Sequence, residues 1–262
     1  MERKIIFFDI DGTILSHRNY TISASTKSAI RKAKEKGHLT FVNTGRTFSE
    51  IDEEVKSVGF DGYVCGCGTC IYHDSSIIFH TKLESDIRKN IIRDLERLNI
   101  NAVMEGNHAI YFNRQLVNPK LQHLYDMYKN LGFNVRTYDD PDMVFDKFCI
   151  WIDLKSDVHA FCDIYKDQLD FISRENLFLE VIPKGYSKAT GIKYLLSHLN
   201  LPHESTYAFG DSANDLTMLN YVKHSIGMGN SEEEIKKIVT YITKDVDDDG
   251  IAHALKHFNI IE

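Results

Sequence analysis

Apolar and polar residues follow two different patterns along the chain, one near both ends and another in the middle. Near both ends, short and mostly apolar runs, such as those at 4–8 and 207–209, are separated by longer amphipathic segments. Short runs without alternation are typical of strands that are buried on both faces. Strands that alternate with helices in this way predict a parallel sheet covered by helices on both faces. We therefore expect an α/β fold with a Rossmann-like parallel-sheet core.

The helices of this core follow from the spacing of apolar residues and from end signals. A helix through Ile30 is expected to end at Gly37, and a capping box of Ser231 and Glu234 is expected to begin another. A further amphipathic helix, ended by Gly59, is predicted by four apolar residues: Phe48, Ile51, Val55 and Val58. The remaining core elements are expected at 39–42, 63–65, 71–79, 214–220, 224–228, 241–243 and 251–258.

The middle of the chain has a different pattern, in which helices are followed by short strands rich in aromatic residues. These elements are expected at 87–98, 102–105, 109–112, 121–131, 148–154, 158–169 and 178–182. Such a repetition predicts a separate α+β unit inserted between two halves of the parallel-sheet domain. We place the core at residues 1–81 and 184–262, and the inserted unit at residues 82–183.

Composition and charge narrow the class of protein. The chain has 262 residues, of which 43% are hydrophobic and 26% charged, as is ordinary for a globular protein. Its net charge of −7 argues against a nucleic-acid partner, which would need a basic face. No apolar run approaches the roughly 20 residues of a membrane helix, and the charged start does not resemble a signal peptide. Five cysteines, an odd number, favour a reducing compartment, so we expect a cytoplasmic protein.

The first strand ends in two aspartates, Asp9 and Asp11. Residues two apart in an extended strand point to the same side, so both carboxylates can face one ligand. Gly12 allows a sharp turn there, and Thr13 offers a hydroxyl at the bend. An Asx-type turn would also explain Asp-Gly, but it leaves Asp9 unexplained in an interior strand. Carboxylates that converge at a strand end indicate a Mg²⁺ site.

Further polar groups follow other predicted strands, where ligands of an open parallel sheet bind. They are Thr44, Gly45 and Arg46 after the strand at 39–42, Lys188 near the start of a helix, and Asp211, Asn214 and Asp215 after the strand at 207–209. Each group by itself also fits a capping turn, a solvated lysine or a capped helix. Together, however, acids, a hydroxyl, backbone amides and a lysine are what Mg²⁺-assisted phosphoryl transfer requires.

These motifs, in this order, resemble those of the haloacid dehalogenase superfamily. FFDIDGTIL, VNTGR, SKATGI and FGDSANDLTML are similar to the motifs of Cof-type phosphatases with a large inserted cap. IGMGNS and DDDG extend the resemblance over the whole chain, whereas the insert shares only its architecture. The resemblance implies a core of the haloacid dehalogenase type and a cap formed by the insert.

The resemblance also implies roles for individual residues. Asp9 would be the nucleophile that accepts the phosphoryl group, and Asp11 would be the general acid and then the general base. Mg²⁺ would be held by Asp9, the backbone carbonyl of Asp11 and Asp211, with Asp215 helping through water. The phosphate oxygens would be bound by Thr44, the Gly45 amide, Lys188, Asn214 and the Ile10 amide. Arg46 is a candidate for a further contact with an anionic substrate.

Two positions depart from the pattern of the family. Cys67 stands where an asparagine is expected, and Asn43 stands where a small apolar residue is usual, which we do not expect to alter the chemistry. The first departure lies among residues whose spacing also permits a Cys₃His zinc site: Cys65, Cys67, Cys70 and His73. Because a strand and hairpin would place these side chains on both faces, we favour small buried thiols. His253 and His257, four apart on the last helix, are interpreted as a surface pair.

The leading hypothesis is a Mg²⁺-dependent phosphatase that acts on small phosphorylated metabolites such as sugar phosphates, through an aspartyl-phosphate. A phosphotransferase or sugar phosphomutase could use the same core. A non-catalytic sensor of phosphorylated metabolites is the third hypothesis, which the intact acid, base and nucleophile positions argue against. The sequence carries no indication of the oligomeric state.

Overall fold

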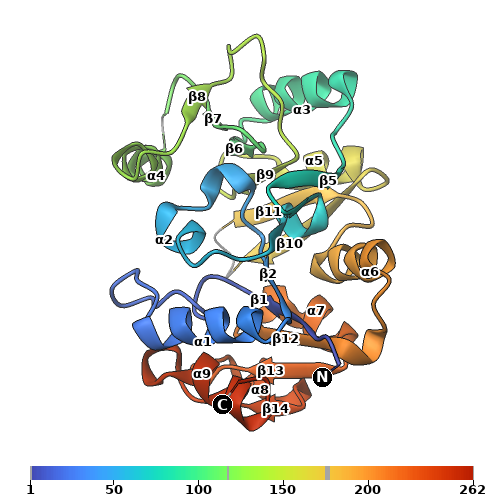
Figure 1. The fold of residues 1–262 in the computed structure, drawn as a ribbon. Coiled ribbons are helices and arrows are strands. Elements are labelled where there is room, and N and C mark those ends of the chain that lie inside the picture. Colours follow the sequence, from blue (N-terminus) through green and yellow to red (C-terminus); the bar gives the residue numbers. More distant parts are fainter. Residues whose placement is uncertain (1, 117, 175–177, 262) are drawn as a thin grey trace. The chain divides into compact units, whose positions relative to one another are not determined.

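The computed structural model describes residues 2–116, 118–174 and 178–261 (Figure 1). The chain forms two compact units. The first consists of Met1–Gly45, Glu53–Phe79 and Ser187–Glu262, and the second of Arg46–Asp52 and His80–Tyr186. The segment Arg46–Asp52, which we expected to remain with the core at residues 1–81, thus belongs to the second unit. Among the described residues, no helix has the length and apolar character that crossing a membrane requires.

The first unit is built on an eight-stranded sheet with the order β14-β13-β12-β1-β2-β3-β4-β5. The central strand β1 pairs in parallel with β2 and β12, so that segments from the two ends of the chain lie side by side in Figure 1. Only β4 runs antiparallel, against β3, among the pairings described. The strands are β1 Ile5–Phe8, β2 Leu39–Asn43, β3 Gly62–Cys65, β4 Cys70–His73, β5 Ser76–His80, β12 Thr206–Gly210, β13 His224–Gly227 and β14 Tyr241–Ile242. The predicted parallel sheet is confirmed.

Helices cover both faces of this sheet. On one face of the sheet, Ile5 and Phe7 of the buried strand β1 pack with Ile192 and Leu195 of α6. Because side chains alternate along a strand, Ile6 points to the opposite face, where α1 packs against α9. The helices are α1 Ala24–Glu35, α2 Glu53–Lys56, α6 Lys188–Leu199, α7 Leu216–Tyr221, α8 Glu233–Ile238 and α9 Gly250–His257. Short 3₁₀ turns are η2 Gly66–Gly68, η3 His203–Ser205, η4 Ala213–Asp215 and η5 Val246–Asp248. This covering explains why β1 is apolar throughout.

The single helix predicted from Phe48 to Val58 is wrong. The chain instead forms the 3₁₀ turn η1 Phe48–Glu50, is extended at Ile51 and then forms the short helix α2. The Glu50 carboxylate accepts hydrogen bonds from the amide and hydroxyl of Thr47 at 2.8 and 2.9 Å, which closes the turn on itself. It also accepts the Tyr128 hydroxyl at 3.1 Å. A local capping turn and one contact distant in sequence therefore override the apolar spacing.

The capping box predicted at Ser231 is also wrong. The helix α8 has Glu232 as its N-cap residue, without a side-chain cap. The Ser231 hydroxyl donates to the carbonyl of Gly210 at 3.3 Å, so it serves the end of β12 rather than the helix.

The second unit contains a six-stranded sheet with the order β10-β11-β9-β6-β7-β8. Its strands are β6 Asn101–Glu105, β7 Ile110–Phe112, β8 Val135–Thr137, β9 Lys147–Trp151, β10 Leu169–Arg174 and β11 Phe178–Pro183, and its helices are α3 Ser85–Arg97, α4 Pro119–Asn130 and α5 Val158–Tyr165. The predicted α+β character is confirmed. The strand β8 was not predicted, and the helix expected at 158–169 ends at Tyr165, before β10 begins.

A buried ion cluster lies within this second sheet. Lys147 lies 2.6 Å from Glu105 and 2.7 Å from Glu180, and all three side chains are almost inaccessible. Burial, followed by the charge of Glu50, raises the pKa of Glu105 to about 7, although Lys147 opposes this shift. In this cluster, two buried acids, Glu105 and Glu180, thus share one buried base, Lys147.

Candidate active site

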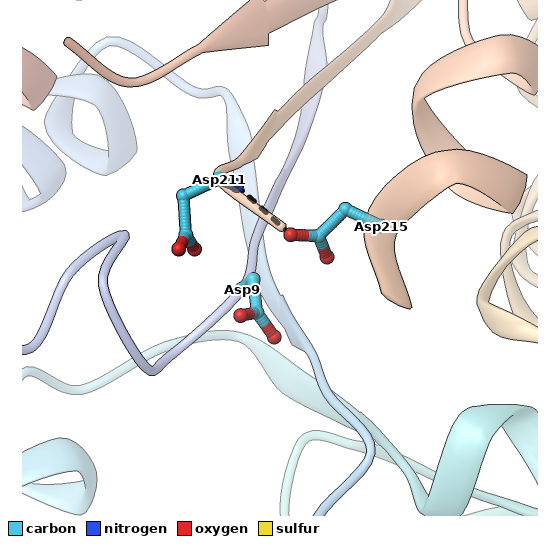
Figure 2. A group of neighbouring side chains, drawn as sticks. All are labelled: Asp9, Asp211 and Asp215. Atoms are coloured by element: carbon cyan, nitrogen blue, oxygen red, sulfur yellow. Dashed lines mark hydrogen bonds between the residues drawn. The ribbon is translucent and has the colours of Figure 1, made fainter. Parts of the chain in front are cut away.

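Three buried carboxylates gather where strands of the first sheet end. Asp9 follows β1 and Asp211 follows β12, and because these strands pair in parallel with Phe8 opposite Phe209, their following residues lie together. The amide of Asp9 donates to the carbonyl of Phe209 at 3.1 Å. Asp215 reaches the same place from η4, and one oxygen atom from each of the three side chains lies within 4.8 Å of the others (Figure 2). The predicted convergence of acids from distant parts of the chain is confirmed for these three residues.

The ammonium group of Lys188 bridges two of these acids. Its Nζ donates to Asp9 Oδ1 and to Asp215 Oδ1, both at 2.6 Å. Lys188 is the first residue of α6, and a capping box between Ser187 and Thr190 closes that turn of the helix. Burial by itself would lower the pKa of Lys188, but the carboxylates of Asp215 and Asp9 outweigh burial and raise it. Lys188 is therefore a permanent positive charge inside the site.

Negative charge exceeds positive charge in this buried cluster. Three carboxylates face one ammonium group, and burial together with the neighbouring Asp215 raises the pKa of Asp9 well above its usual range. Burial and Asp215 likewise raise the pKa of Asp211 to about 7, against the opposing hydrogen bond from Thr13. Carboxylate groups in such an arrangement favour either protons or a hard cation with oxygen ligands.

Asp215 organises the site as well as contributing charge. Its Oδ2 accepts the backbone amides of Asp211 and Ser212 at 2.9 and 3.3 Å, while Oδ1 accepts Lys188. Figure 2 shows the first of these bonds. The carboxylate packs so closely on Gly210 that a Cβ atom there would lie 2.6 Å from Asp215 Cγ. The glycine at the end of β12 therefore makes room for this side chain.

The loop after β1 is a tight turn that holds Asp211 in place. The carbonyl of Ile10 accepts the amides of three residues: Thr13, Ile14 and Leu15. Gly12 has a φ of 74°, and a Cβ atom there would lie 2.4 Å from Asp211 Oδ2. The Thr13 hydroxyl donates to Asp211 Oδ1 at 2.8 Å. Asp11 lies half-buried within this loop.

The expected phosphate-binding residues occupy strand and turn ends. Thr44 is buried directly after β2, its amide donates to the carbonyl of Val64 at 2.9 Å, and the half-buried Gly45 follows it. Asn214 is half-buried in η4 and accepts the Ser212 hydroxyl at 2.8 Å. Arg46, by contrast, belongs to the second unit, where it donates to the carbonyl of Glu50 at 3.2 Å.

Some residues that support the site were not assigned a role from the sequence. Asn230 donates to the carbonyl of Gly12 at 2.7 Å and accepts the amide of Val246 at 2.9 Å, which ties the loop after β1 to the segment after β13. Asn43 donates to the carbonyl of Lys188 at 3.0 Å. A polar residue at the end of a mostly apolar strand was the available signal for Asn43, and Asn230 stands in the motif IGMGNS, but the partners of both are distant in sequence.

The cysteine-rich segment does not form a zinc site in the described part of the chain. Cys65 and Cys70 are directly opposite each other on β3 and β4, whereas His73 packs its ring on Phe41, with centroids 5.6 Å apart. Cys65, Cys67 and Cys70 are buried, as favoured from the sequence. His253 and His257 are exposed, and the His257 ring stacks on Tyr241.

Comparison with known proteins agrees with this geometry. The sequence model for haloacid dehalogenase-like hydrolases matches residues 6–255. In Bacillus subtilis (strain 168), the 5-amino-6-(5-phospho-D-ribitylamino)uracil phosphatase YitU is 28% identical over 279 residues, covering 98% of this chain and 99% of YitU. Phosphatase YwpJ of the same organism is 26% identical over 283 residues, covering 97% of this chain and 99% of YwpJ.

A solved structure extends the likeness to the whole fold. The subclass IIB sugar phosphatase BT4131 superposes with a TM-score of 0.82 at 26% identity, covering 98% of this chain and 100% of that protein. The chain thus belongs to the haloacid dehalogenase-like hydrolases and is a phosphatase of that family. The family that the sequence motifs resemble is confirmed.

Proposed function

We propose that this protein hydrolyses phosphate monoesters of small metabolites with the help of Mg²⁺, and that Asp9 is transiently phosphorylated. The observation that carries the proposal is the buried cluster of Asp9, Asp211 and Asp215 around the single ammonium group of Lys188. A purely structural cluster would balance its charges, because unpaired buried charges are costly. The excess of carboxylates instead suits a divalent cation and an anionic substrate.

The donor set fits Mg²⁺ by its chemistry. Asp9 and Asp211 would supply carboxylate oxygens, Asp11 its backbone carbonyl, and Asp215 would act through water. All these donors are oxygens, which Mg²⁺ prefers, and two of the acids have raised pKa values that a bound cation would lower. When bound, the ion would neutralise part of the charge on the phosphate.

The chain's own residues would divide the reaction into two steps. In the first, an Asp9 oxygen forms a bond to phosphorus while the bond to the leaving oxygen breaks, and Asp11 gives that oxygen a proton. In the second, Asp11 takes a proton from water, whose oxygen attacks the phosphorus and releases Asp9 and inorganic phosphate. Two steps with a covalent intermediate are each easier than direct hydrolysis. A positioned acid or base contributes about 10²–10⁴-fold.

The remaining residues would hold the transferring group. Lys188 already contacts Asp9 and would share its charge with the phosphate oxygens, which reduces repulsion between nucleophile and substrate. The other contacts proposed are Thr44, Asn214 and the amides of Ile10 and Gly45. Arg46 would make a further contact with an anionic part of the substrate, a role proposed from its position next to Gly45 in the chain.

The proposed substrate class is small phosphorylated metabolites, among them sugar phosphates. Support comes from the names of relatives that span the full chain, which include a phosphatase for a phosphorylated ribityl compound and a sugar phosphatase. Both act on a phosphate carried by a polyhydroxylated carbon chain or ring, so a panel of such compounds is the first choice.

The test is release of inorganic phosphate from an aryl phosphate and from the metabolite panel, with and without Mg²⁺. Asp9→Asn should fold normally and lose at least about 10³-fold in kcat, because the amide is not a nucleophile. The matched control is Asp61→Asn, which should retain activity. Asp61 lies directly before β3 and accepts hydrogen bonds from the amide and hydroxyl of Thr40. Wild-type rates in Asp9→Asn would refute the proposal. Transfer of phosphate to a second sugar, with dependence on a bisphosphate, would favour the phosphomutase instead.

A further inference from the structure

Asn43 is a polar side chain at the end of β2 that is completely inaccessible to solvent. Its Nδ2 donates to the backbone carbonyl of Lys188 at 3.0 Å and lies 3.6 Å from the sulfur of Met218. Lys188 is 145 positions further along the chain, so this contact exists only in the folded protein. Asn43 thus links the end of β2 with the helix that begins at Lys188.

The orientation of the Asn43 amide follows from its partner. A backbone carbonyl only accepts hydrogen bonds, so the amino group must face Lys188 and the amide oxygen must point elsewhere. Among the described residues, Asn43 Oδ1 is buried without a hydrogen-bond partner. An apolar side chain of the same shape would avoid this unfavourable burial, so Asn43 is not explained by the stability of the core.

The hydrogen bond from Asn43 matters because the backbone of Lys188 determines where its ammonium group lies. The Nζ atom of Lys188 donates to Asp9 and to Asp215, both at 2.6 Å. Because Lys188 is the first residue of α6, keeping both bonds leaves little freedom for the start of this helix to move. The capping box at Ser187 fixes the amides of the first turn, but it leaves the carbonyl of Lys188 to other partners. Asn43 bonds that carbonyl from the neighbouring strand.

We propose that Asn43 is a positioning residue: by binding the backbone of Lys188, it keeps the ammonium group between Asp9 and Asp215. The inference deepens the proposed function and rests on it. Asn43 also directly precedes Thr44, so one side chain connects two groups proposed to bind the same phosphate. This proposal differs from the expectation from the sequence, that Asn43 leaves the chemistry unaltered.

The test is the variant Asn43→Leu, which preserves the shape of the side chain and removes the donor. A small displacement of a catalytic group costs up to about 10²-fold in rate, so we expect kcat to fall about 10–100-fold. KM should change by less than about threefold, because the lost effect concerns charge neutralisation in the transition state. The free energy of unfolding should be unchanged or higher, since the unpartnered oxygen is gone.

A matched control separates positioning from general stability. Phe41→Leu alters the same strand two residues earlier, on the same face, within the apolar cluster that also contains Phe7 and Val64. It should lose stability and keep kcat, the opposite of Asn43→Leu. Should Asn43→Leu not fold, Asn43→Ala is compared with Phe41→Leu in the same way.

The proposal fails if Asn43→Leu and Asn43→Ala keep kcat, or if their kcat falls only in proportion to stability. Either outcome leaves the proposed function intact as long as the wild type releases phosphate and Asp9→Asn does not. If the proposed function itself is incorrect, the wild-type protein will not release phosphate.

Discussion

The hydroxyl of Thr13 donates a hydrogen bond of 2.8 Å to Asp211, a residue 198 positions further along the chain. This bond occupies one oxygen of Asp211 and directs the other toward Gly12, where a Cβ atom would be only 2.4 Å away. The loop after β1 and the loop after β12 therefore hold each other in place. Each provides an acid of the buried cluster, and neither acid would be placed by its own loop alone.

The first prediction concerns pH. Burial and Asp215 raise the pKa of Asp211 to about 7 in the metal-free protein, above its value in the unfolded chain. The folded state then binds a proton more tightly, so this contribution to stability is present at low pH and is lost as the pH rises through about 7. Because Mg²⁺ requires the carboxylate, its affinity should rise over the same interval.

Thermal unfolding with and without Mg²⁺ at about pH 6 and about pH 8 measures both effects. We expect Mg²⁺ to stabilise the wild type more at the higher pH. Asp211→Asn serves as the control and should show little stabilisation by Mg²⁺ at either pH. Equal stabilisation of the wild type at both pH values would contradict the prediction.

The second prediction concerns Gly210. In Gly210→Ala, the new Cβ would lie 2.6 Å from Asp215 Cγ, so Asp215 must move away from Lys188 and the amide of Asp211. We expect the free energy of unfolding to fall by about 1–3 kcal/mol and the phosphatase activity to fall with it. Urea unfolding and phosphate release measure the two quantities.

Gly37→Ala provides the contrast, because Gly37 has a φ of 86° and, its two chain neighbours aside, no described atom lies within 4 Å of its Cβ position. It should cost about 1 kcal/mol through backbone strain while leaving activity unaltered. If both variants lose activity equally, the proposed role of the Gly210–Asp215 contact is incorrect.

The third prediction concerns the ion cluster of the second unit. Lys147→Met would leave Glu105 and Glu180 buried without their shared cation, which should cost about 3–5 kcal/mol at neutral pH. The pKa of Glu105 is raised from 4.5 to about 7, so its contribution to folded-state stability is present below about 4.5 and is lost as the pH rises through about 7. The destabilisation should therefore be smaller in acid.

Denaturant unfolding of Lys147→Met at about pH 5 and about pH 8 tests this difference. The double variant with Glu105→Gln should recover part of the stability lost at the higher pH. A cost that does not vary with pH, or no recovery in the double variant, would show that charge is not the cause.

The fourth prediction concerns the thiols. Cys65, Cys67, Cys70 and Cys149 are buried, and Cys162 is half-buried. Burial raises the pKa of both Cys149 and Cys162, which lowers their thiolate fraction. In the native protein we expect a thiol reagent to label Cys162 alone and slowly, and all five cysteines after unfolding.

A strong metal chelator should not change the number of reactive thiols, and Cys162→Ser should abolish labelling of the native protein. Release of three thiols by the chelator would instead revive the zinc site considered from the sequence.

Two of the predictions that failed involve contacts that residue spacing does not report. The break at Ile51 depends on Glu50, which bonds both Thr47 and Tyr128, and the hydroxyl of Ser231 was drawn to Gly210. Thr47 is a local partner of Glu50, whereas Tyr128 for Glu50 and Gly210 for Ser231 are partners of a second kind, which are distant in sequence. Spacing reports only on neighbours within a turn or two, so it cannot reveal the second kind of contact.

The sequence by itself determined the strands and helices that build the parallel sheet, because continuous apolar runs and helical spacing are local properties of the chain. It also indicated the three acids and the lysine that gather in the buried cluster: Asp9, Asp211, Asp215 and Lys188. Tertiary structure alone decided that Lys188 lies between Asp9 and Asp215, that Thr13 orients Asp211 and that Asn43 reaches Lys188. The physical reason is that these contacts join residues many positions apart, which approach each other only when the sheet has formed.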